Sequence, residues 1–143
     1  TSGNHLYLKL ALGDWFQWLK RPNAAKVYYR QAHQLSMASS DPKLRTLFNA
    51  PVELPDNDIF FNRLPLKEKK NILIISANFD VLKTGRVINL EIEETDLLNN
   101  RRAKTIIRKI RTTRFRPKFR DGQPVSAVVK NRDYQVFSSV NNY

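Results

Sequence analysis

The first forty residues place apolar side chains at helical spacing, in two runs separated by a proline. Residues 6 to 19 are apolar on more than one side, which predicts a helix with several packed neighbours. Pro22 interrupts this run and suits the first turn of a second helix, predicted over residues 24 to 37. The apolar residues of the second helix recur at intervals of three and four: Ala25, Tyr28, Tyr29, Ala32 and Leu35. Together the two runs predict an antiparallel helical hairpin, with Trp15 and Trp18 packed between helical layers. An alternative is that the two tryptophans line a groove for an extended peptide.

The segment after the hairpin predicts a short helix and then an irregular connector. Asp41 precedes Pro42, a pair that is typical of a helix start, so we expect a short capping helix here. Residues 50 to 70 contain three prolines and several Asp and Asn residues, which indicates an irregular segment. Three apolar residues are expected to pin it to a neighbouring surface: Ile59, Phe60 and Phe61.

From residue 72 the apolar period changes to two, which is typical of half-buried strands. The first strand places four apolar residues on one face: Ile75, Ala77, Phe79 and Val81. Gly85 supplies the positive φ that a tight turn needs. In the strand after the turn, the apolar face is predicted to consist of Ile88, Leu90 and Ile92. The two strands predict an antiparallel hairpin.

A second helical pattern follows residue 100, with Asn99 or Asn100 as its N-cap. Its apolar face, expected to lie on the strand hairpin, consists of Ala103, Ile106, Ile107 and Ile110. The rest of the helix is a basic face formed by Arg101, Arg102, Lys104, Arg108, Lys109 and Arg111.

A rigid corner over residues 114 to 125 separates this helix from the end of the chain. Its structural residues are predicted to be Phe115, Pro117, Asp121, Gly122 and Pro124. We expect Phe115 and Pro117 inside the protein, the arginines of the corner outside, and a turn at Asp121-Gly122. The valine-rich run over residues 126 to 137 then predicts a last strand, expected at a sheet edge.

These elements predict an α+β protein of 143 residues, which is long enough for one domain or two small ones. We expect residues 1–49 to form a helical region with a capping helix and residues 50–70 to form the connector. We expect residues 71–143 to form a small antiparallel sheet covered by one helix, in the order strand, strand, helix, strand.

Charge is concentrated beside the corner. The net charge is +12, and residues 101 to 120 contain ten Lys and Arg and no acidic residue. The absence of cysteine excludes a disulfide framework. No apolar run approaches the ~20 residues that span a bilayer, and the first residues lack the order of a signal peptide. Because the sequence also starts without methionine, we expect a processed protein or a fragment.

Residues 6 to 37 resemble one tetratricopeptide repeat. Small residues at Gly13 and Ala32 let two helices approach closely, and the large Phe16 and Tyr29 fill the space between them. Lys9 stands where the repeat has a large apolar residue. One such repeat cannot bury both of its faces, so we expect the second unit or further repeats to cover it.

Residues 72 to 137 resemble the TonB carboxy-terminal domain family. The resemblance is carried, in order, by Lys83-Thr84-Gly85-Arg86-Val87, the helix led by Ala103, Arg114-Phe115-Arg116-Pro117, and Asp121-Gly122-Gln123-Pro124-Val125. It implies a non-enzymatic periplasmic protein of a Gram-negative envelope that acts in transport through contacts with protein partners, such as an outer-membrane receptor component. Helical repeats stand here where the energy transducers of that family have a long proline-rich spacer.

The resemblance implies that the last strand binds a partner by strand addition. The residues assigned to this edge are Ser126, Val128, Lys130, Arg132, Tyr134 and Val136. The resemblance also allows a homodimer formed by strand pairing. Two alternatives remain open: a basic nucleic-acid-binding module, and a structural cap on a larger repeat protein. An acidic protein or anionic lipid surface is a further possible partner for the basic face.

The sequence favours no catalytic site, cofactor or metal centre. His5 and His33 are the only histidines, they lie far apart in sequence, and no cysteine accompanies them. The sequence has neither a nucleophile elbow nor a phosphate-binding glycine loop. The one dense acidic group, predicted to be solvent-exposed where it lies on a strand, consists of Glu91, Glu93, Glu94 and Asp96.

Overall fold

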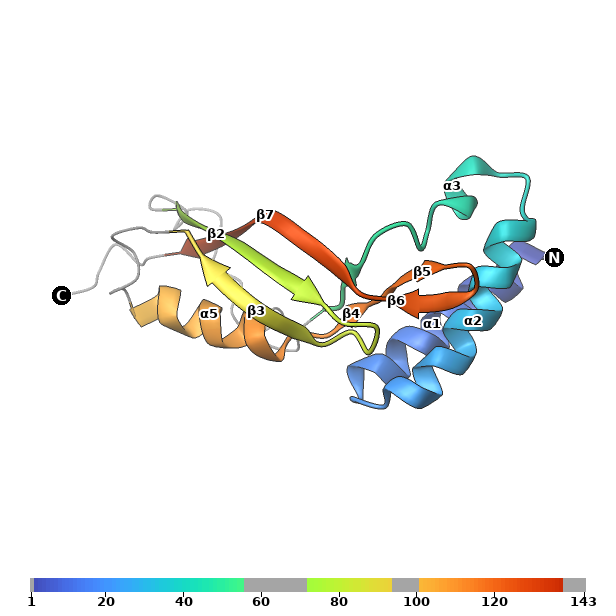
Figure 1. Ribbon diagram of the computed structural model, residues 1–143, viewed down its shortest axis with the longest axis horizontal. Helices are drawn as coiled ribbons and strands as arrows, with labels where there is room; N and C mark the ends of the chain where they lie inside the picture. The colour runs from blue at the N-terminus through green and yellow to red at the C-terminus, as the bar shows by residue number, and fades with distance from the viewer. Residues whose placement is uncertain (1, 56–71, 94–100, 138–143) are drawn as a thin grey trace.

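A computed structural model describes residues 2–55, 72–93 and 101–137 and shows an α+β protein with antiparallel sheets, as the sequence predicts. Figure 1 shows a helical hairpin at one end and a three-stranded sheet with one helix at the other. The elements are α1 (Ser2–Trp18), α2 (Pro22–Ala38), α3 (Pro42–Arg45), β1 (Val52–Glu53), β2 (Ile72–Val81), β3 (Val87–Ile92), α5 (Arg101–Thr112), β4 (Phe115–Arg116), β5 (Lys118–Arg120), β6 (Gln123–Val125) and β7 (Ala127–Phe137). Several residues singled out from the sequence lie outside the described residues: Ile59, Phe60, Phe61, Glu94, Asp96, Asn99 and Asn100. No helix among the described residues is long and apolar enough to cross a membrane.

The α1–α2 hairpin is confirmed, and α2 begins at Pro22 as expected. Gly13 is needed for close approach, because a Cβ atom there would lie 2.5 Å from the Tyr29 ring. Ala25 and Ala32 are fully buried beside Tyr29. The predicted packing of Trp15 is wrong, since 56% of its surface is exposed. An evenly apolar helix does not reveal which of its faces will be covered.

The short helix after the hairpin is also confirmed. The Asp41 side chain accepts a hydrogen bond from the Lys43 backbone amide (2.9 Å), which caps the first turn of α3. Phe48, just after α3, is buried against the edge of the Tyr29 ring. This contact closes one end of the helical core.

The main sheet has the strand order β3-β2-β7, and each strand is antiparallel to its neighbour. The predicted inner face of β2 is confirmed, because its four apolar residues are all buried: Ile75, Ala77, Phe79 and Val81. Helix α5 covers this face through the buried Ala103 and Ile110 and the partly buried Ile106. Ile107, predicted on the same face, is partly buried and lies outside these clusters.

Two asparagines with positive φ mark bulges on either side of β2. Asn89 in β3 has φ 55°, and the β2–β3 register shifts between Asn78 and Asp80. Asn131 in β7 also has φ 55°, and the β2–β7 register shifts between Ala77 and Phe79. Each bulge adds one residue to β3 or to β7. Beyond the bulge, the side chains of that strand therefore point to the opposite face of the sheet from the one that regular alternation predicts.

The bulge at Asn89 corrects one prediction. Ile88 pairs with Asp80 on the uncovered face, whereas Val87 pairs with the buried Val81 on the inner face. The predicted inward face of β3 is therefore wrong at Ile88, although Leu90 and Ile92 do pack on the core.

The corner contains a second hairpin that the sequence did not predict. β5 and β6 pair on either side of Asp121-Gly122, whose φ values of 52° and 77° match the two-residue turn with two positive φ angles. This hairpin lies over the helical half in Figure 1. It places Phe119 in the helical core, in contact with Tyr29 and Phe48.

The first part of the corner joins the two halves of the chain. Phe115 and Pro117 are buried as predicted, and Phe115 belongs to the core under the sheet. The expectation that all arginines of the corner point outward is wrong for Arg116, which binds Asp14 of α1 (2.8 Å). Its burial follows from a partner that lies far away in the sequence.

Candidate functional site

The outer edge of β7 is the candidate site, because it carries an eleven-residue strand with one neighbour. β7 pairs with β2 from Ala127 to Phe137, and no other described strand pairs with it. Outside this pairing, no backbone hydrogen bond joins β7 to another described segment. An edge strand of this length presents a row of backbone donors and acceptors to a second chain.

The register identifies which backbone groups of β7 point outward. The Glu93 amide donates to the Ser76 carbonyl (3.0 Å), so the backbone groups of Ser76 point toward β3. Asp133 lies opposite Ser76 in β7 and therefore directs its own N–H and C=O away from β2. Gln135, two residues further on, points the same way. The neighbours Arg132 and Tyr134 use their backbone groups in the ladder with β2.

The bulge at Asn131 divides the predicted edge residues between two faces. Val128 pairs with Asp80 on the uncovered face and is 63% exposed. Arg132 and Tyr134 pair with the buried Ala77 and Ile75, so they lie on the face that α5 covers. Ser126 is exposed just before β7, and Lys130 is exposed at the bulge. Val136 belongs to the strand through its pairing with Leu73.

Arg132, Tyr134 and Glu53 form a polar cluster beside the edge. Arg132 Nη2 lies 3.0 Å from Glu53 Oε2, and the Tyr134 hydroxyl donates a hydrogen bond to Glu53 Oε1. The Arg132 guanidinium also lies over the Tyr134 ring, with its Cζ 4.5 Å from the ring centroid. Burial and the hydrogen bond to Glu53 raise the pKa of Tyr134, so its hydroxyl stays protonated at neutral pH.

Arg132 also covers part of the edge itself. Its Nη1 donates to the carbonyl oxygen of Asp133 at 2.6 Å. That carbonyl is one of the outward-pointing acceptors, so a side chain of the same strand occupies it. Natural edge strands use bulges and charged side chains in this way to limit unspecific pairing. Here the bulge at Asn131 and the Arg132 contact protect the edge without covering its length.

A groove crosses the uncovered face of the sheet between the two bulges. Its volume is about 700 Å³, and its lining residues are Asn78, Phe79, Asp80, Asn89, Leu90, Glu91, Val128, Lys130 and Asn131. Asn89 Nδ2 donates a hydrogen bond to Asp80 Oδ2 at 2.9 Å, and this bond orients the Asp80 carboxylate in the groove. Among the described residues, no group of three or more His, Cys, Asp or Glu side chains could hold a metal ion.

The basic face of α5 lies on the opposite side of that helix from the sheet core. Four of its cations are exposed: Arg101, Lys104, Arg108 and Arg111. Arg102 and Lys109 are partly buried. Helix α5 contacts both β3 and β7 and packs on the core through its apolar side, so the basic face and the β7 edge form two separate candidate surfaces.

The two histidines lie on different helices and have different surroundings. His33 packs between the rings of Phe48 and Phe119, and burial lowers its pKa. His5 is exposed on α1. Their positions fit packing and surface roles.

Sequence reasoning missed Glu53, because a two-residue strand inside a proline-rich segment has no periodic pattern. It also missed Asn131, although asparagine is one of the few residues that tolerate positive φ. An Asn in the middle of a valine-rich strand is the signal that identifies such a bulge.

A scan with protein-family models finds no match to this chain, and a search of curated proteins finds none either.

Proposed function

We propose that the protein is a non-enzymatic adaptor that captures an extended segment of a partner protein by strand addition to β7. The observation that carries this proposal is the outward row of backbone groups at Asp133 and Gln135. Backbone hydrogen bonds would give affinity, and alternate side chains of the added strand would give selectivity.

The arrangement of residues 72 to 137 supports a TonB-like form of this adaptor. A strand hairpin, a covering helix and a last strand beside the first strand of the hairpin follow one another in the chain. In this proposal the α1–α2 hairpin is a tetratricopeptide-like unit that holds the sheet in place. The compartment is the periplasm, and the partner is an envelope protein involved in transport.

Side chains of the added strand would alternate between the two faces of the sheet and would contact different residues on each face. On one face, the segment would meet the Glu53, Arg132 and Tyr134 cluster. On the other face it would meet the exposed Val128, Asp133 and Gln135. Apart from Val128, these residues all carry polar groups, so a segment rich in polar side chains would fit this edge best.

A random peptide library displayed on phage, selected on the immobilised protein, tests the proposal. Selected peptides are synthesised and their affinities are measured for Gln135→Pro and Gln135→Ala. Proline removes the outward N–H of residue 135 and leaves the ladder with β2 intact, whereas alanine removes only the side chain. We expect the proline variant to bind at least about tenfold more weakly, and the alanine variant to bind within about threefold of the original protein.

Two outcomes would overturn the proposal. One is selection that yields no peptide above background. The other is equal affinity of the selected peptides for both Gln135 variants, because strand addition requires the amide that proline lacks. Circular dichroism of each variant confirms that the fold is retained before affinities are compared.

A further inference from the structure

A small cleft lies where the helical half meets the end of α5. Its volume is about 200 Å³, and Trp18 and Lys20 line it from the end of α1. Thr113 and Arg114 line it from the segment after α5, and Leu54 and Pro55 contribute an apolar wall. The Leu54 amide donates to the Arg114 carbonyl at 3.0 Å, which fixes this wall against the arginine.

A second arginine stands beside this cleft. Arg86, just before β3, forms an isolated antiparallel bridge with Arg114, so the two residues are directly opposite each other. Side chains in such a pair share a face and lie close together, and like charges at these positions destabilise the pairing. Burial and the charge of Arg86 lower the pKa of Arg114, which is the direction expected of a cation crowded by another cation.

These cations have no anionic counterpart in the described parts of the chain. Lys20, Arg86 and Arg114 form no ion pair with any described acidic side chain. The Arg114 Nε atom is buried and has no hydrogen-bond partner. Arg30 Nε is also buried without a partner, but of the two arginines only Arg114 lines this cleft, so its guanidinium is the donor that an anion there would meet.

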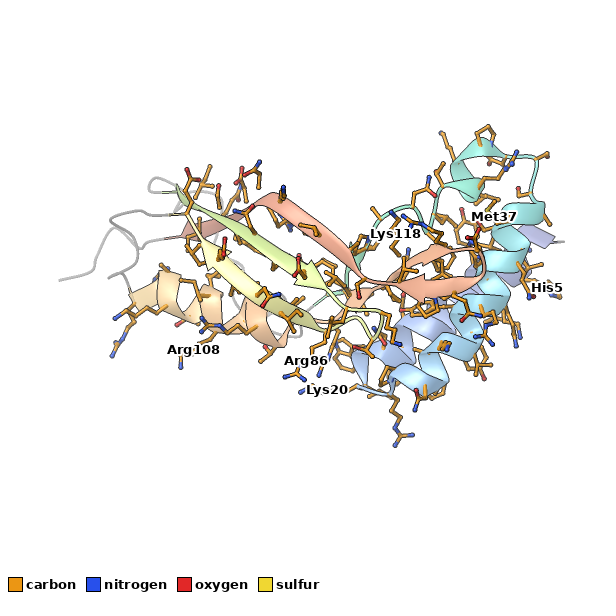
Figure 2. The ribbon with its side chains drawn as sticks, in the orientation of Figure 1. His5, Lys20, Met37, Arg86, Arg108 and Lys118 are labelled. Carbon is orange, nitrogen blue, oxygen red and sulfur yellow. The ribbon has the colours of Figure 1, made fainter. Side chains whose placement is uncertain are left out.

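The backbone near the cleft neutralises little of the positive charge of Lys20, Arg86 and Arg114. The carboxyl end of α5 carries a partial charge of roughly half an elementary negative charge, against three full positive charges. The Thr113 hydroxyl donates to the Lys109 carbonyl (2.7 Å), so one of the end carbonyls is already occupied. Figure 2 shows Lys20, Arg86 and Arg108 along the same long side of the molecule, so the basic face of α5 adds to the positive potential there.

We propose that the cleft between Trp18, Lys20 and Arg114 binds a phosphate group. Arginine suits this ligand because its planar guanidinium donates parallel hydrogen bonds to two phosphate oxygens. Lys20 supplies a second charge, and Trp18 with Leu54 forms a wall for the body to which the phosphate is attached. The phosphate belongs either to a soluble phosphate compound or to the headgroup of an anionic lipid.

The chain's own tryptophans report on this site. Trp15 and Trp18 are the only tryptophans, and their ring centroids are 5.8 Å apart, so the emission of the chain comes from the cleft and its border. Inorganic phosphate is titrated against sodium chloride at matched ionic strength. Vesicles of phosphatidylcholine, with and without phosphatidylglycerol, form the second arm of the experiment.

Charge-matched variants separate the cleft from general attraction. Arg114→Gln and Lys20→Gln each remove one charge from the cleft, and Arg101→Gln removes the same charge from the other end of α5. We expect saturable binding that weakens about tenfold or more in Arg114→Gln and changes by less than about twofold in Arg101→Gln. The Lys20→Gln variant, altered at an exposed side chain, is expected to weaken binding even if Arg114→Gln folds poorly.

The two arms identify the source of the phosphate. A response to inorganic phosphate without a response to phosphatidylglycerol vesicles supports a soluble ligand, and the reverse supports a lipid headgroup. No saturable response in either arm would overturn the proposal. Equal losses in Arg101→Gln and Arg114→Gln would also overturn it, because they would show diffuse attraction to a basic surface.

Discussion

Arg116 of β4 binds Asp14 of α1 through two parallel hydrogen bonds, Nε to Oδ1 at 3.1 Å and Nη2 to Oδ2 at 2.8 Å. The Tyr29 hydroxyl donates to the same carboxylate at 2.6 Å, so one acidic side chain connects both helices to the corner. Burial alone would lower the pKa of Arg116, but the hydrogen bonds and the charge of Asp14 raise it. This contact joins the helical half to the sheet half.

We expect Asp14→Asn to destabilise the protein by about 1–3 kcal/mol, because it leaves Arg116 largely buried without its counter-charge. Urea denaturation of Asp14→Asn, Arg116→Gln and the double variant forms a double-mutant cycle. The double variant should lose less free energy of unfolding than the sum of the single variants. Additive losses would show that the pair is not coupled.

Gly85 and Gly122 both have positive φ, but their surroundings differ. A Cβ atom at Gly85 would lie 2.2 Å from the Phe115 carbonyl oxygen and 1.7 Å from Gln17 Nε2, whereas one at Gly122 meets nothing within 4 Å. We expect Gly122→Ala to cost about 1 kcal/mol of unfolding free energy and Gly85→Ala about 3 kcal/mol or more. Chemical denaturation measures both values, and similar losses would contradict the close packing at Gly85.

The Gly85 result also reports on Gln17. Its buried side chain donates to the carbonyls of Thr84 and Phe115, each at 2.7 Å. Displacement of this amide by an alanine at position 85 would leave the buried Phe115 carbonyl and the partly buried Thr84 carbonyl without their donor. The two hydrogen bonds join α1 to the turn of the sheet hairpin and to β4.

His33 should make stability depend on pH. Its pKa is lowered in the folded protein, so the unfolded chain binds a proton at a higher pH than the native state does. The stabilisation from neutral His33 is therefore present above about pH 6.5 and is lost as the pH falls through the folded pKa. His33→Phe, which keeps a ring against Phe48 and Phe119, should lose less stability between pH 7 and pH 5. Parallel stability curves for the two proteins would rule out this role.

Arg132 should restrain strand addition. Because its guanidinium occupies the outward carbonyl of Asp133, Arg132→Ala frees one acceptor at the β7 edge. We expect the affinity for a selected peptide to rise about two- to tenfold, which corresponds to one hydrogen bond that no longer has to be displaced. Lys130→Ala is the matched control, since it removes a neighbouring exposed charge and leaves the carbonyl contact in place. Weaker binding by Arg132→Ala, with unchanged binding by Lys130→Ala, would contradict this role and would show that the contacts of Arg132 with the peptide outweigh the release of the Asp133 carbonyl.

The elements with a clear period could be predicted from the sequence. The inner face of β2 follows from strict alternation, and α2 follows from its spacing of three and four. Alternation failed at Ile88, because the bulge at Asn89 shifts the register by one residue. Such a bulge depends on one backbone angle, which hydrophobic patterns do not encode.

The contacts between the helical half and the sheet half could not be predicted, because they join residues that are far apart in the sequence. Asp14 and Arg116 are 102 positions apart, and each residue type is most often exposed. Phe119 of the corner fills the helical core rather than the core under the sheet, because the β5–β6 hairpin carries it there. The candidate edge strand could be predicted from the sequence. That the backbone groups of Asp133 and Gln135 point outward follows only from the register between β2 and β7.

Amide hydrogen exchange along β7, followed by NMR on the unliganded protein, tests the free edge most directly. The amides of Asp133 and Gln135 should exchange rapidly, because they point away from β2, whereas those of Arg132 and Tyr134 should be protected within the ladder. A selected peptide should then slow exchange at Asp133 and Gln135. Strong protection of Asp133 and Gln135 in the unliganded protein, independent of protein concentration, would show that the chain covers its own edge and would contradict strand addition.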